Sequence, residues 1–373
     1  MNKERLVQEF LELVQIDSET KNERTICNVL SEKFTELGLK VEEDDAAEQT
    51  GHGAGNLVCT LAGDREDADV IYFTSHMDTV VPGKGIKPQI ENDVIKSDGT
   101  TILGADDKAG IAAILEAVRV LKEENRSHGT VQFVIPVGEE SGLVGSKALD
   151  ASLLKAKYGF ALDSDGDVGN IIAAAPTQAK LFVDIYGKTA HAGVAPEKGV
   201  SAITIAAKAI AKMPLGRIDG ETTANIGSFR GGSQTNIVCD HVEIIAEARS
   251  LDEEKMKKQV EQMTTAFEET ARKMNGSADV NVKLMYPGYR FEDGDPVVET
   301  AKAAVKKIGR KPELHASGGG SDANNINGLG VPTVNLAIGY ENIHTTNEQL
   351  RISELEKAAE LVLAIIDEAA ASA

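Results

Sequence analysis

The chain contains few cysteines, and their scarcity argues against a disulfide-stabilised scaffold. Three occur in 373 residues, at Cys27, Cys59 and Cys239. Their number is odd, they are scattered, and no C-x-x-C motif is present, so no disulfide framework is predicted. A reducing compartment, the cytoplasm, is the simplest setting for such a chain.

Basic residues and long apolar runs are also lacking. Lys and Arg number 39 against 59 Asp and Glu, which gives a formal net charge of −20. Nucleic-acid-binding proteins carry a basic footprint, so we expect no nucleic-acid partner. No apolar run approaches the roughly 20 residues that span a bilayer, and we expect no membrane association. The N-terminal segment 1–19 is predicted to be an amphipathic helix rather than a signal peptide.

The length and the pattern of elements indicate two domains, one inserted into the other. Residues 1–175 alternate strand and helix patterns, including a helix at 107–124, which predicts an α/β domain with a mostly parallel sheet. Residues 176–287 have a different β-α-β-β-α-β pattern, the split ferredoxin-like arrangement. The α/β pattern returns over 288–373. No internal repeat interrupts this plan.

Histidines and acidic residues stand where the predicted strands end. The apolar runs 70–75, 131–137, 158–162 and 331–338 lead to the following candidates: His76 and Asp78, Glu139 and Glu140, Asp163, and His344. Sites in open α/β sheets form outside the carboxyl ends of the strands. Two histidines and several carboxylates converging there would provide the ligands of a zinc hydrolase.

Each candidate also has an ordinary structural explanation when taken alone. Asp106 and Asp107 begin a helix, where aspartate commonly caps the free N–H groups, although Asp106 could instead bridge two cations. Asp78 could accept the second N–H of a metal-bound His76, or both could be loop residues. Glu139 and Glu140 are consecutive, so they fit poorly as a glycosidase pair. Their joint occurrence favours a dinuclear metal site.

Several strings resemble the co-catalytic zinc peptidases of the tripeptidase T and carboxypeptidase G2 type, an M20-like family. They are Ser75-His76-Met77-Asp78-Thr79-Val80, Gly104-Ala105-Asp106-Asp107-Lys108-Ala109-Gly110, Gly138-Glu139-Glu140-Ser141-Gly142, Ala161-Leu162-Asp163 and His344-Thr345-Thr346-Asn347-Glu348. The resemblance covers nearly the whole chain. It implies a three-layer α/β catalytic domain with an inserted α+β ferredoxin-like dimerisation domain, and hence a homodimer.

The resemblance also implies a role for each residue. His76 and Asp163 would hold one Zn²⁺, and Glu140 and His344 the other, with Co²⁺ or Mn²⁺ as possible substitutes. Asp106 would bridge the two ions through a segment with a cis Asp106–Asp107 peptide bond. Glu139 would be the general base, and Asp78 would orient His76.

The inserted domain and a glycine-rich loop resemble the family's substrate-binding parts. Within Gly187-Lys188-Thr189-Ala190-His191-Ala192-Gly193, His191 would reach the neighbouring subunit's active site. Asn236 and Arg249 would contact the substrate carboxylate. Without the resemblance, the sequence favours an ordinary loop asparagine and an exposed strand arginine at these positions. The resemblance implies that Gly319 lies in a glycine loop close to the substrate. Gly318 stands where tripeptidase T usually has arginine, which weakens an expectation of strict tripeptide specificity.

The sequence therefore predicts a dizinc aminopeptidase acting on short peptides. Two alternatives keep the same metal site but cleave another amide, as a carboxypeptidase or an N-acyl amino-acid deacylase. Asp163 favours the aminopeptidase, because the resembling deacylases and carboxypeptidases often carry Glu there. A metal-binding protein without catalysis would have no use for Glu139 as a base that binds no metal.

Overall fold

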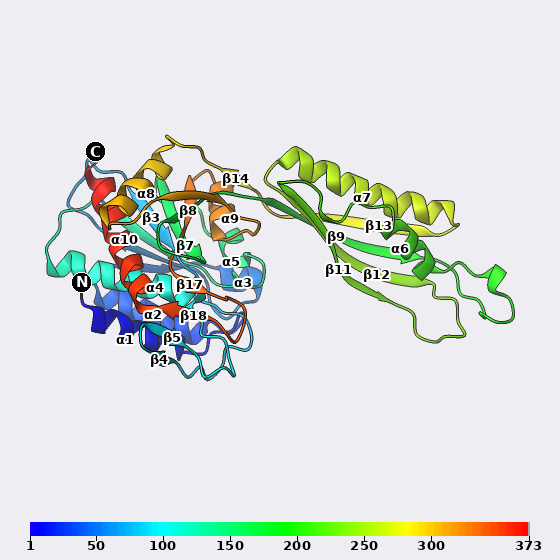
Figure 1. Ribbon diagram of the computed structural model, residues 1–373, viewed down its shortest axis with the longest axis horizontal. Coiled ribbons are helices and arrows are strands. Elements are labelled where there is room, and N and C mark those ends of the chain that lie inside the picture. The colour runs from blue at the N-terminus through cyan, green and yellow to red at the C-terminus, as the bar shows by residue number, and fades with distance from the viewer. Residues whose placement is uncertain (372–373) are drawn as a thin grey trace. The chain divides into compact units, whose positions relative to one another are not determined.

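A computed structural model describes residues 1–371, and these form two compact units. Unit 1 comprises residues 1–174, 290–317 and the chain from Ser321 onward. Unit 2 comprises Ala175–Tyr289 and the short segment Gly318–Gly320. Each unit has its own helices and strands (Figure 1) and its own hydrophobic core. None of the described helices is both long and apolar enough to cross a bilayer.

Unit 1 is built on one large sheet. In order across it, the strands are β1 (Lys40–Glu43), β2 (Leu57–Leu61), β6 (Val131–Ile135), β3 (Ile71–Thr74), β7 (Tyr158–Ser164), β16 (Thr333–Ala337), β8 (Asn170–Ala175) and β14 (Tyr289–Arg290), with β15 (Glu313–Ala316) paired to β8. The central strands β6, β3, β7 and β16 are mutually parallel. Their carboxyl ends therefore meet at one edge, as the sequence predicts.

Side chains of successive strand residues enter two different cores, which makes the unit three-layered. Ile71 and Phe73 of β3 pack into the larger core, whereas Tyr72 between them packs into the smaller one. This follows from the two-residue period of a strand. The larger core is covered by α1 (Lys3–Val14), α2 (Arg24–Glu36), α4 (Ala105–Glu123), α8 (Pro296–Lys307) and α10 (Ile352–Ala371). On the other face lie α9 (Asp322–Gly328) and its neighbours α5 (Val144–Lys147) and α3 (Ala46–Thr50). The expected three-layer α/β domain is confirmed.

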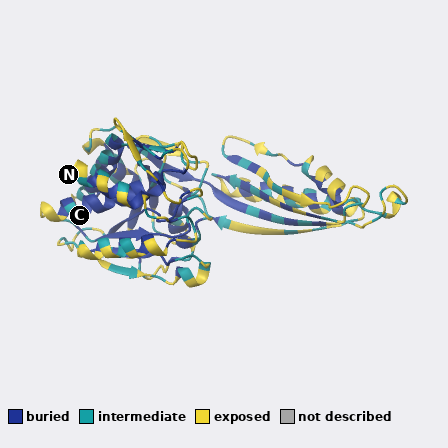
Figure 2. Cartoon of the chain, turned by 90° about the horizontal axis from the view of Figure 1, so that it is seen from below, coloured by how far each residue is buried: buried dark blue, intermediate teal, exposed yellow. Residues whose placement is uncertain are grey.

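A second, four-stranded sheet completes unit 1. Its order is β17 (Tyr340–Glu341), β18 (Gln349–Arg351), β5 (Val94–Lys96) and β4 (Gln89–Glu91), all antiparallel. Strand β17 also packs against α4, whose residues are buried over most of its length (Figures 1 and 2). The turn between β17 and β18 contains His344.

Unit 2 has the expected β-α-β-β-α-β order. Its elements are β9 (Thr177–Tyr186), α6 (Ala202–Ile210), β11 (Thr222–Gly231), β12 (His241–Ser250), α7 (Glu253–Lys273) and β13 (Ser277–Tyr286), with a short 3₁₀ turn at Pro196–Lys198 and a short strand β10 (Gly216–Arg217). The sheet is antiparallel, in the order β10-β11-β12-β9-β13. The ferredoxin-like arrangement is confirmed.

The apolar stripe of α6 serves this unit's own core. Ala202, Ile205, Ala206 and Ala209 are fully buried with residues of β9, β12 and α7. These four side chains are therefore not available for pairing with another chain. The stripe packs inward because a helix laid on a sheet must bury its apolar side there.

Candidate metal centre

His76, directly after β3, is fully buried with its two ring nitrogens facing different partners. Nδ1 lies 3.0 Å from the carbonyl oxygen of Asp78 and 3.5 Å from its Oδ1. Nε2 lies 3.1 Å from Oδ1 of Asp106 and 3.8 Å from Oδ1 of Asp163. A proton on Nδ1 can be donated to Asp78, which leaves the lone pair of Nε2 toward the carboxylates. Asp78 thus contacts His76 as expected, more closely through its carbonyl than through its carboxylate.

The carboxylate of Asp106 lies between the two histidines. Its Oδ1 faces His76, and its Oδ2 is 3.3 Å from Nε2 of His344. The same Nε2 of His344 is 3.1 Å from Oε1 of Glu140. The structure therefore brings together all five residues that the sequence predicts as metal ligands: His76, Asp106, Glu140, Asp163 and His344.

The donor set fits metal ions. Ligand atoms of His76, Asp106 and Glu140 lie within 4.8 Å of one another, as do those of His76, Asp107 and Asp163. Two ligands of a tetrahedral Zn²⁺ with bonds of about 2.1 Å are roughly 3.4 Å apart. The separations of 3.1, 3.3 and 3.8 Å around His76 and His344 lie close to that value. Imidazole nitrogens and carboxylate oxygens are also the ligand types that zinc accepts.

Asp107 has a different role from the helix cap that the sequence suggested. The Asp106–Asp107 peptide bond is cis, as predicted. However, no side chain caps α4, which begins after Gly104 in a left-handed conformation (φ 75°). Oδ2 of Asp107 instead accepts a hydrogen bond from the backbone N–H of His76 at 3.1 Å. The capping interpretation is wrong, because Oδ2 accepts from the backbone of His76 and Oδ1 of Asp107 has no hydrogen-bond partner in the described chain.

Glu139 and Glu140 follow β6 and are held by one carboxylate. Oδ1 and Oδ2 of Asp78 accept hydrogen bonds from their backbone N–H groups at 3.1 and 3.3 Å. The side chain of Glu140 reaches His344, whereas that of Glu139 has no such contact with a histidine among the described residues. The structure thus separates the two consecutive glutamates into different surroundings.

The electrostatics show a buried excess of negative charge. Burial raises the pKa of Glu139 and of Asp163 well above the usual range, and neighbouring carboxylates add to both shifts. Burial alone would lower the pKa of His76, but its hydrogen bonds with Asp106 and Asp78 outweigh that effect and raise it. Hydrogen bonds with Asp106 and then Glu140 raise the pKa of His344 to about 10. Buried charge of one sign requires compensation, which bound cations would supply.

Comparison with known proteins identifies the family. The model of peptidase family M20/M25/M40 matches residues 72–368. The chain belongs to this family. It is 70% identical to the aminopeptidase PepT from Bacillus cereus ATCC 10987, with a TM-score of 0.94 over 99% of each chain. It is 53% identical to a tripeptidase from Staphylococcus aureus subsp. aureus Mu50, with a TM-score of 0.96 over 100% of this chain and 99% of that one.

A more distant relative agrees with this result. Peptidase T of Clostridium perfringens (strain 13 / Type A) is 30% identical over 96% of this chain and 97% of its own. The family and the exopeptidase class that the sequence predicts are thus confirmed.

In this M20 peptidase, further residues contact the candidate ligands, and sequence reasoning assigned them no role. The Tyr340 hydroxyl donates a hydrogen bond to Oδ1 of Asp163 at 3.1 Å. The Glu348 carboxylate accepts one from the backbone N–H of Asp106 at 2.9 Å. The side-chain amide of Asn335 accepts a hydrogen bond from the backbone N–H of Asp163 and donates one to its carbonyl oxygen. Glu348 stands in a string that resembles the family and could have been noticed, whereas nothing in the sequence singles out Tyr340 or Asn335.

Unit 2 of this M20 peptidase does not bring its predicted substrate-binding residues together. His191 follows β9, and Asn236 precedes β12; their loops pair through an Ala192 N–H to Asn236 carbonyl bond of 2.9 Å. Arg249 lies near the other end of β12, paired with Gln178 near the start of β9. Arg249 is eight positions after His241 in β12, which is roughly 26 Å at about 3.3 Å per residue.

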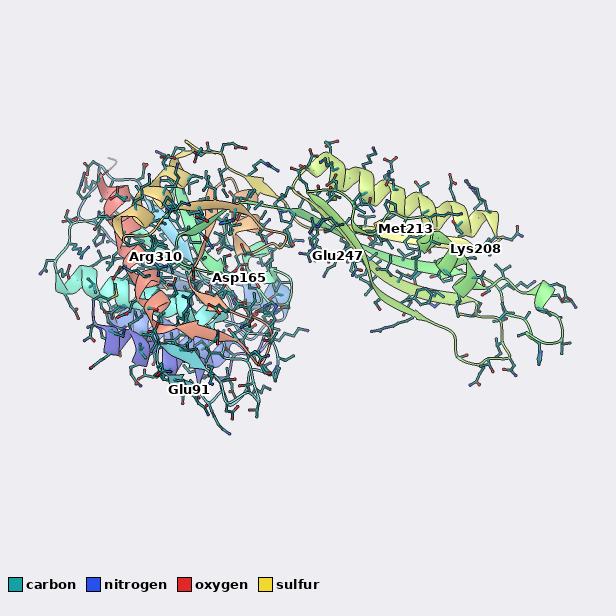
Figure 3. The ribbon with its side chains drawn as sticks, in the orientation of Figure 1. Glu91, Asp165, Lys208, Met213, Glu247 and Arg310 are labelled. Atoms are coloured by element: carbon teal, nitrogen blue, oxygen red, sulfur yellow. The ribbon has the colours of Figure 1, made fainter. Side chains whose placement is uncertain are left out.

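Arg249 instead contacts the glycine-rich loop. Its Nε and Nη2 donate to the carboxylate of Glu247 at 2.9 and 3.2 Å, and Nη1 lies 3.4 Å from the carbonyl oxygen of Gly318 (Glu247 is labelled in Figure 3). Gly319 follows directly. Arg249 and Gly319 therefore form one group in unit 2, and His191 and Asn236 form another at the opposite end of its sheet.

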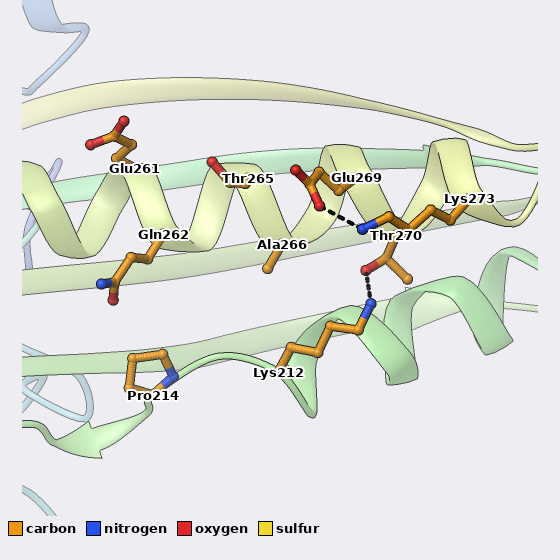
Figure 4. A pocket seen from close by; sticks show the side chains of 9 residues that line it. All are labelled: Lys212, Pro214, Glu261, Gln262, Thr265, Ala266, Glu269, Thr270 and Lys273. Carbon is orange, nitrogen blue, oxygen red and sulfur yellow. Dashed lines mark hydrogen bonds and ion pairs between the residues drawn. The ribbon is translucent and has the colours of Figure 1, made fainter.

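Two other features of unit 2 involve none of the predicted site residues. A pocket of about 740 Å³ lies beside α7 (Figure 4), and none of the predicted site residues is among those that line it: Lys212, Pro214, Glu261, Gln262, Thr265, Ala266, Glu269, Thr270 and Lys273. A third group of possible metal donors, Asp184, His241 and Glu243, lies partly exposed on the sheet.

Proposed function

We propose that this chain is a dizinc aminopeptidase that releases the N-terminal residue from short peptides. The observation that carries the proposal is the position of Asp106, whose two oxygens face His76 and His344 separately. His76 and Asp163 would hold one ion, Glu140 and His344 the other, and Asp106 would serve both. Zn²⁺ suits this nitrogen and oxygen donor set, with Co²⁺ or Mn²⁺ as substitutes.

Glu139 would be the general base. When bound, the metal ions would supply Lewis-acid chemistry that polarises the peptide carbonyl and makes water more acidic. Glu139 would accept the proton of the attacking water and pass it to the leaving amine. Its backbone is fixed by Asp78, and its carboxylate has no contact with His76 or His344 that would occupy it. Its pKa, raised by burial, suits a group that must hold and release a proton.

The residues of unit 2 would bind the substrate. Arg249, held by Glu247 beside Gly318 and Gly319, would offer a cation to the peptide carboxylate. His191 and Asn236 would serve the active site of a second protomer, with His191 donating to the developing oxyanion. Their distance from Arg249 along the sheet supports this division, because one site cannot use both ends of one unit 2.

A two-fold homodimer through unit 2 would provide that second protomer. Strand β10 pairs only with Thr223 and Ala224 of β11, so the outer edge of β11 from Asn225 to Gly231 has no partner strand in the described chain. Phe229 at this edge and Ile203 of α6 are 42% and 39% exposed. Unpaired edges of this kind readily pair with another chain. The cysteines are all free, which suits a cytoplasmic enzyme.

Assays of matched substrates test the proposal. The zinc-loaded protein should release alanine from trialanine faster than from dialanine, and should not cleave N-acetyl-trialanine because the amino end is blocked. N-acetyl-methionine serves as the comparison substrate for a deacylase, and N-acetyl-trialanine as the one for a carboxypeptidase. Faster hydrolysis of N-acetyl-methionine would indicate a deacylase, and release of alanine from N-acetyl-trialanine would indicate a carboxypeptidase.

A further inference from the structure

The hairpin formed by β17, β18 and their turn contacts three separate parts of the candidate metal centre. Residues 340–351 are called the 340–351 hairpin here. Its first strand supplies Tyr340, and the segment between its two strands supplies His344 and Glu348. The strands pair Tyr340 with Leu350 and Glu341 with Gln349, and β18 continues the pairing to β5 (Figure 1). The hairpin is thus anchored in a sheet that itself holds none of the other ligands.

Glu348 fixes the backbone of the segment that carries Asp106. This side chain is 1% exposed, and its Oε2 accepts hydrogen bonds from the N–H groups of Leu103 and Gly104, both at 2.8 Å. Its Oε1 accepts from the N–H of Asp106 at 2.9 Å. Three backbone donors converge on one carboxylate, so the position of Asp106 depends on Glu348.

Tyr340 contacts a second candidate metal ligand, the carboxylate of Asp163. Its hydroxyl donates to Oδ1 of Asp163 at 3.1 Å, and this is the oxygen that lies 3.8 Å from Nε2 of His76. The tyrosine is 1% exposed, so its ring and hydroxyl have one fixed place. A donor on that oxygen sets the direction in which its remaining lone pair points.

We propose that Tyr340 and Glu348 are positioning residues that set the geometry of two metal-facing carboxylates, Asp163 and Asp106. The hairpin then orients three ligands: His344 as part of its own turn, and the two aspartates through these contacts. This inference rests on the proposed function, because it concerns ligands of the proposed metal centre. It predicts different effects for the two residues, since Asp163 faces one histidine whereas Asp106 faces both.

The test measures binding of Co²⁺ to the full-length apoprotein by calorimetry and by visible absorption. Tyr340→Phe removes one oxygen and should weaken one of the two binding steps about 10–100-fold, with the other unchanged. Glu348→Gln should weaken both Co²⁺-binding steps. The NH₂ group of the glutamine must face at least one of the three backbone N–H donors, which displaces the segment that carries Asp106. Both variants should alter the Co²⁺ absorption bands, which report ligand geometry.

Matched controls separate this role from a general loss of stability. Tyr158→Phe removes the hydroxyl of another buried tyrosine, and Glu354→Gln changes another buried glutamate, whose carboxylate accepts a hydrogen bond from the backbone N–H of Val168 at 2.8 Å. Neither contacts a candidate ligand, so Co²⁺ affinities and spectra should match those of the wild type. Thermal melts of all apoproteins show which variants fold. If Glu348→Gln does not fold, the Co²⁺ binding of Tyr340→Phe alone tests the positioning role.

The possible outcomes distinguish the two proposals. Wild-type affinities and spectra in Tyr340→Phe and in folded Glu348→Gln would overturn the positioning role, even if their melting temperatures fell, and would leave the proposed function standing. Failure of the wild type itself to bind Co²⁺ or Zn²⁺ would overturn the proposed function and this inference with it.

Discussion

The carboxylate of Asp78 accepts a hydrogen bond from the backbone N–H of Glu139 at 3.1 Å, while the carbonyl of Asp78 lies 3.0 Å from Nδ1 of His76. Asp78 therefore fixes the position of both a proposed metal ligand, His76, and the proposed general base, Glu139. These two groups come from the ends of β3 and β6, which are neighbours in the sheet. The link explains how a ligand and a base from separate strands keep a constant relative position.

Asp78→Asn should lower kcat/KM about 10–100-fold, as expected for a group that orients others. The carboxylate also accepts from Glu140 at 3.3 Å, and asparagine has only one acceptor oxygen for the two N–H groups. Asp64→Asn is the matched control. The Asp64 carboxylate also accepts a hydrogen bond from a backbone N–H, that of His128, at 2.9 Å, and it contacts none of the proposed site residues. Equal activity of the two variants would refute the linking role of Asp78.

Glu139→Gln should reduce turnover about 10²–10⁴-fold, the usual range for a general base. Its metal content should remain near two ions per chain, because Glu139 is not a proposed ligand. Glu140→Gln should instead lose metal, since Glu140 lies 3.1 Å from His344. Glu91→Gln, on the exposed strand β4 (labelled in Figure 3), should behave as the wild type. The measurements are steady-state rates and metal analysis after dialysis, and near-normal turnover of Glu139→Gln would rule out the role.

Apoprotein prepared with a chelator should lose stability between pH 5 and pH 8. The raised pKa values of Glu139 and Asp163 mean that the folded state favours their protonated forms. These two groups therefore lower the free energy of unfolding more and more as pH rises above their unfolded pKa values. Glu348, raised to about 7 by burial, acts in the same direction. His344, with its pKa raised to about 10, stabilises the fold fully below its unfolded pKa near 6.5, and this contribution declines above it.

Metal should reverse this pH dependence, because cations compensate the buried carboxylates. The lowered pKa values of Asp78 and Asp106 affect stability only at more acidic pH, outside this window. Thermal melts of apoprotein and zinc-loaded protein at pH 5, 6.5 and 8 measure the effect. An apoprotein that is more stable at pH 8 than at pH 5 would contradict the electrostatic description.

Mixing two inactive chains should restore activity if His191 acts on a second protomer. A heterodimer of His191→Ala and Glu139→Gln has one site with a wild-type base and a wild-type histidine from its partner. The mixture should regain up to about half of the wild-type activity per heterodimer, and sedimentation at micromolar concentration should show a dimer. The control mixes His191→Ala with the double variant His191→Ala/Glu139→Gln, which leaves every site without the histidine. Heterodimers without activity, or a monomeric wild type, would reject the trans role.

Local patterns in the chain were sufficient to predict the mostly parallel sheet, the ferredoxin-like insert and the strand ends at which the candidate ligands stand. Strand periodicity located β3, β6, β7 and β16, and parallel strands bring residues such as His76 and Glu140 to one edge whatever the details of packing. The resemblance to the family then implied which five residues hold metal and that the Asp106–Asp107 bond is cis. The strands and helices follow from short stretches of sequence, because a two-residue or 3.6-residue period is repeated within each element.

Contacts between distant segments could not be predicted in this way. Glu348 reaches Asp106 across 242 residues, and Tyr340 reaches Asp163 across 177, only because the 340–351 hairpin pairs with β5 in one register. The inward stripe of α6 and the separation of His191 from Arg249 likewise depend on how helices and strands pack. Packing decides such contacts because the energy of a buried polar group depends on which partner reaches it, and no local pattern specifies that partner.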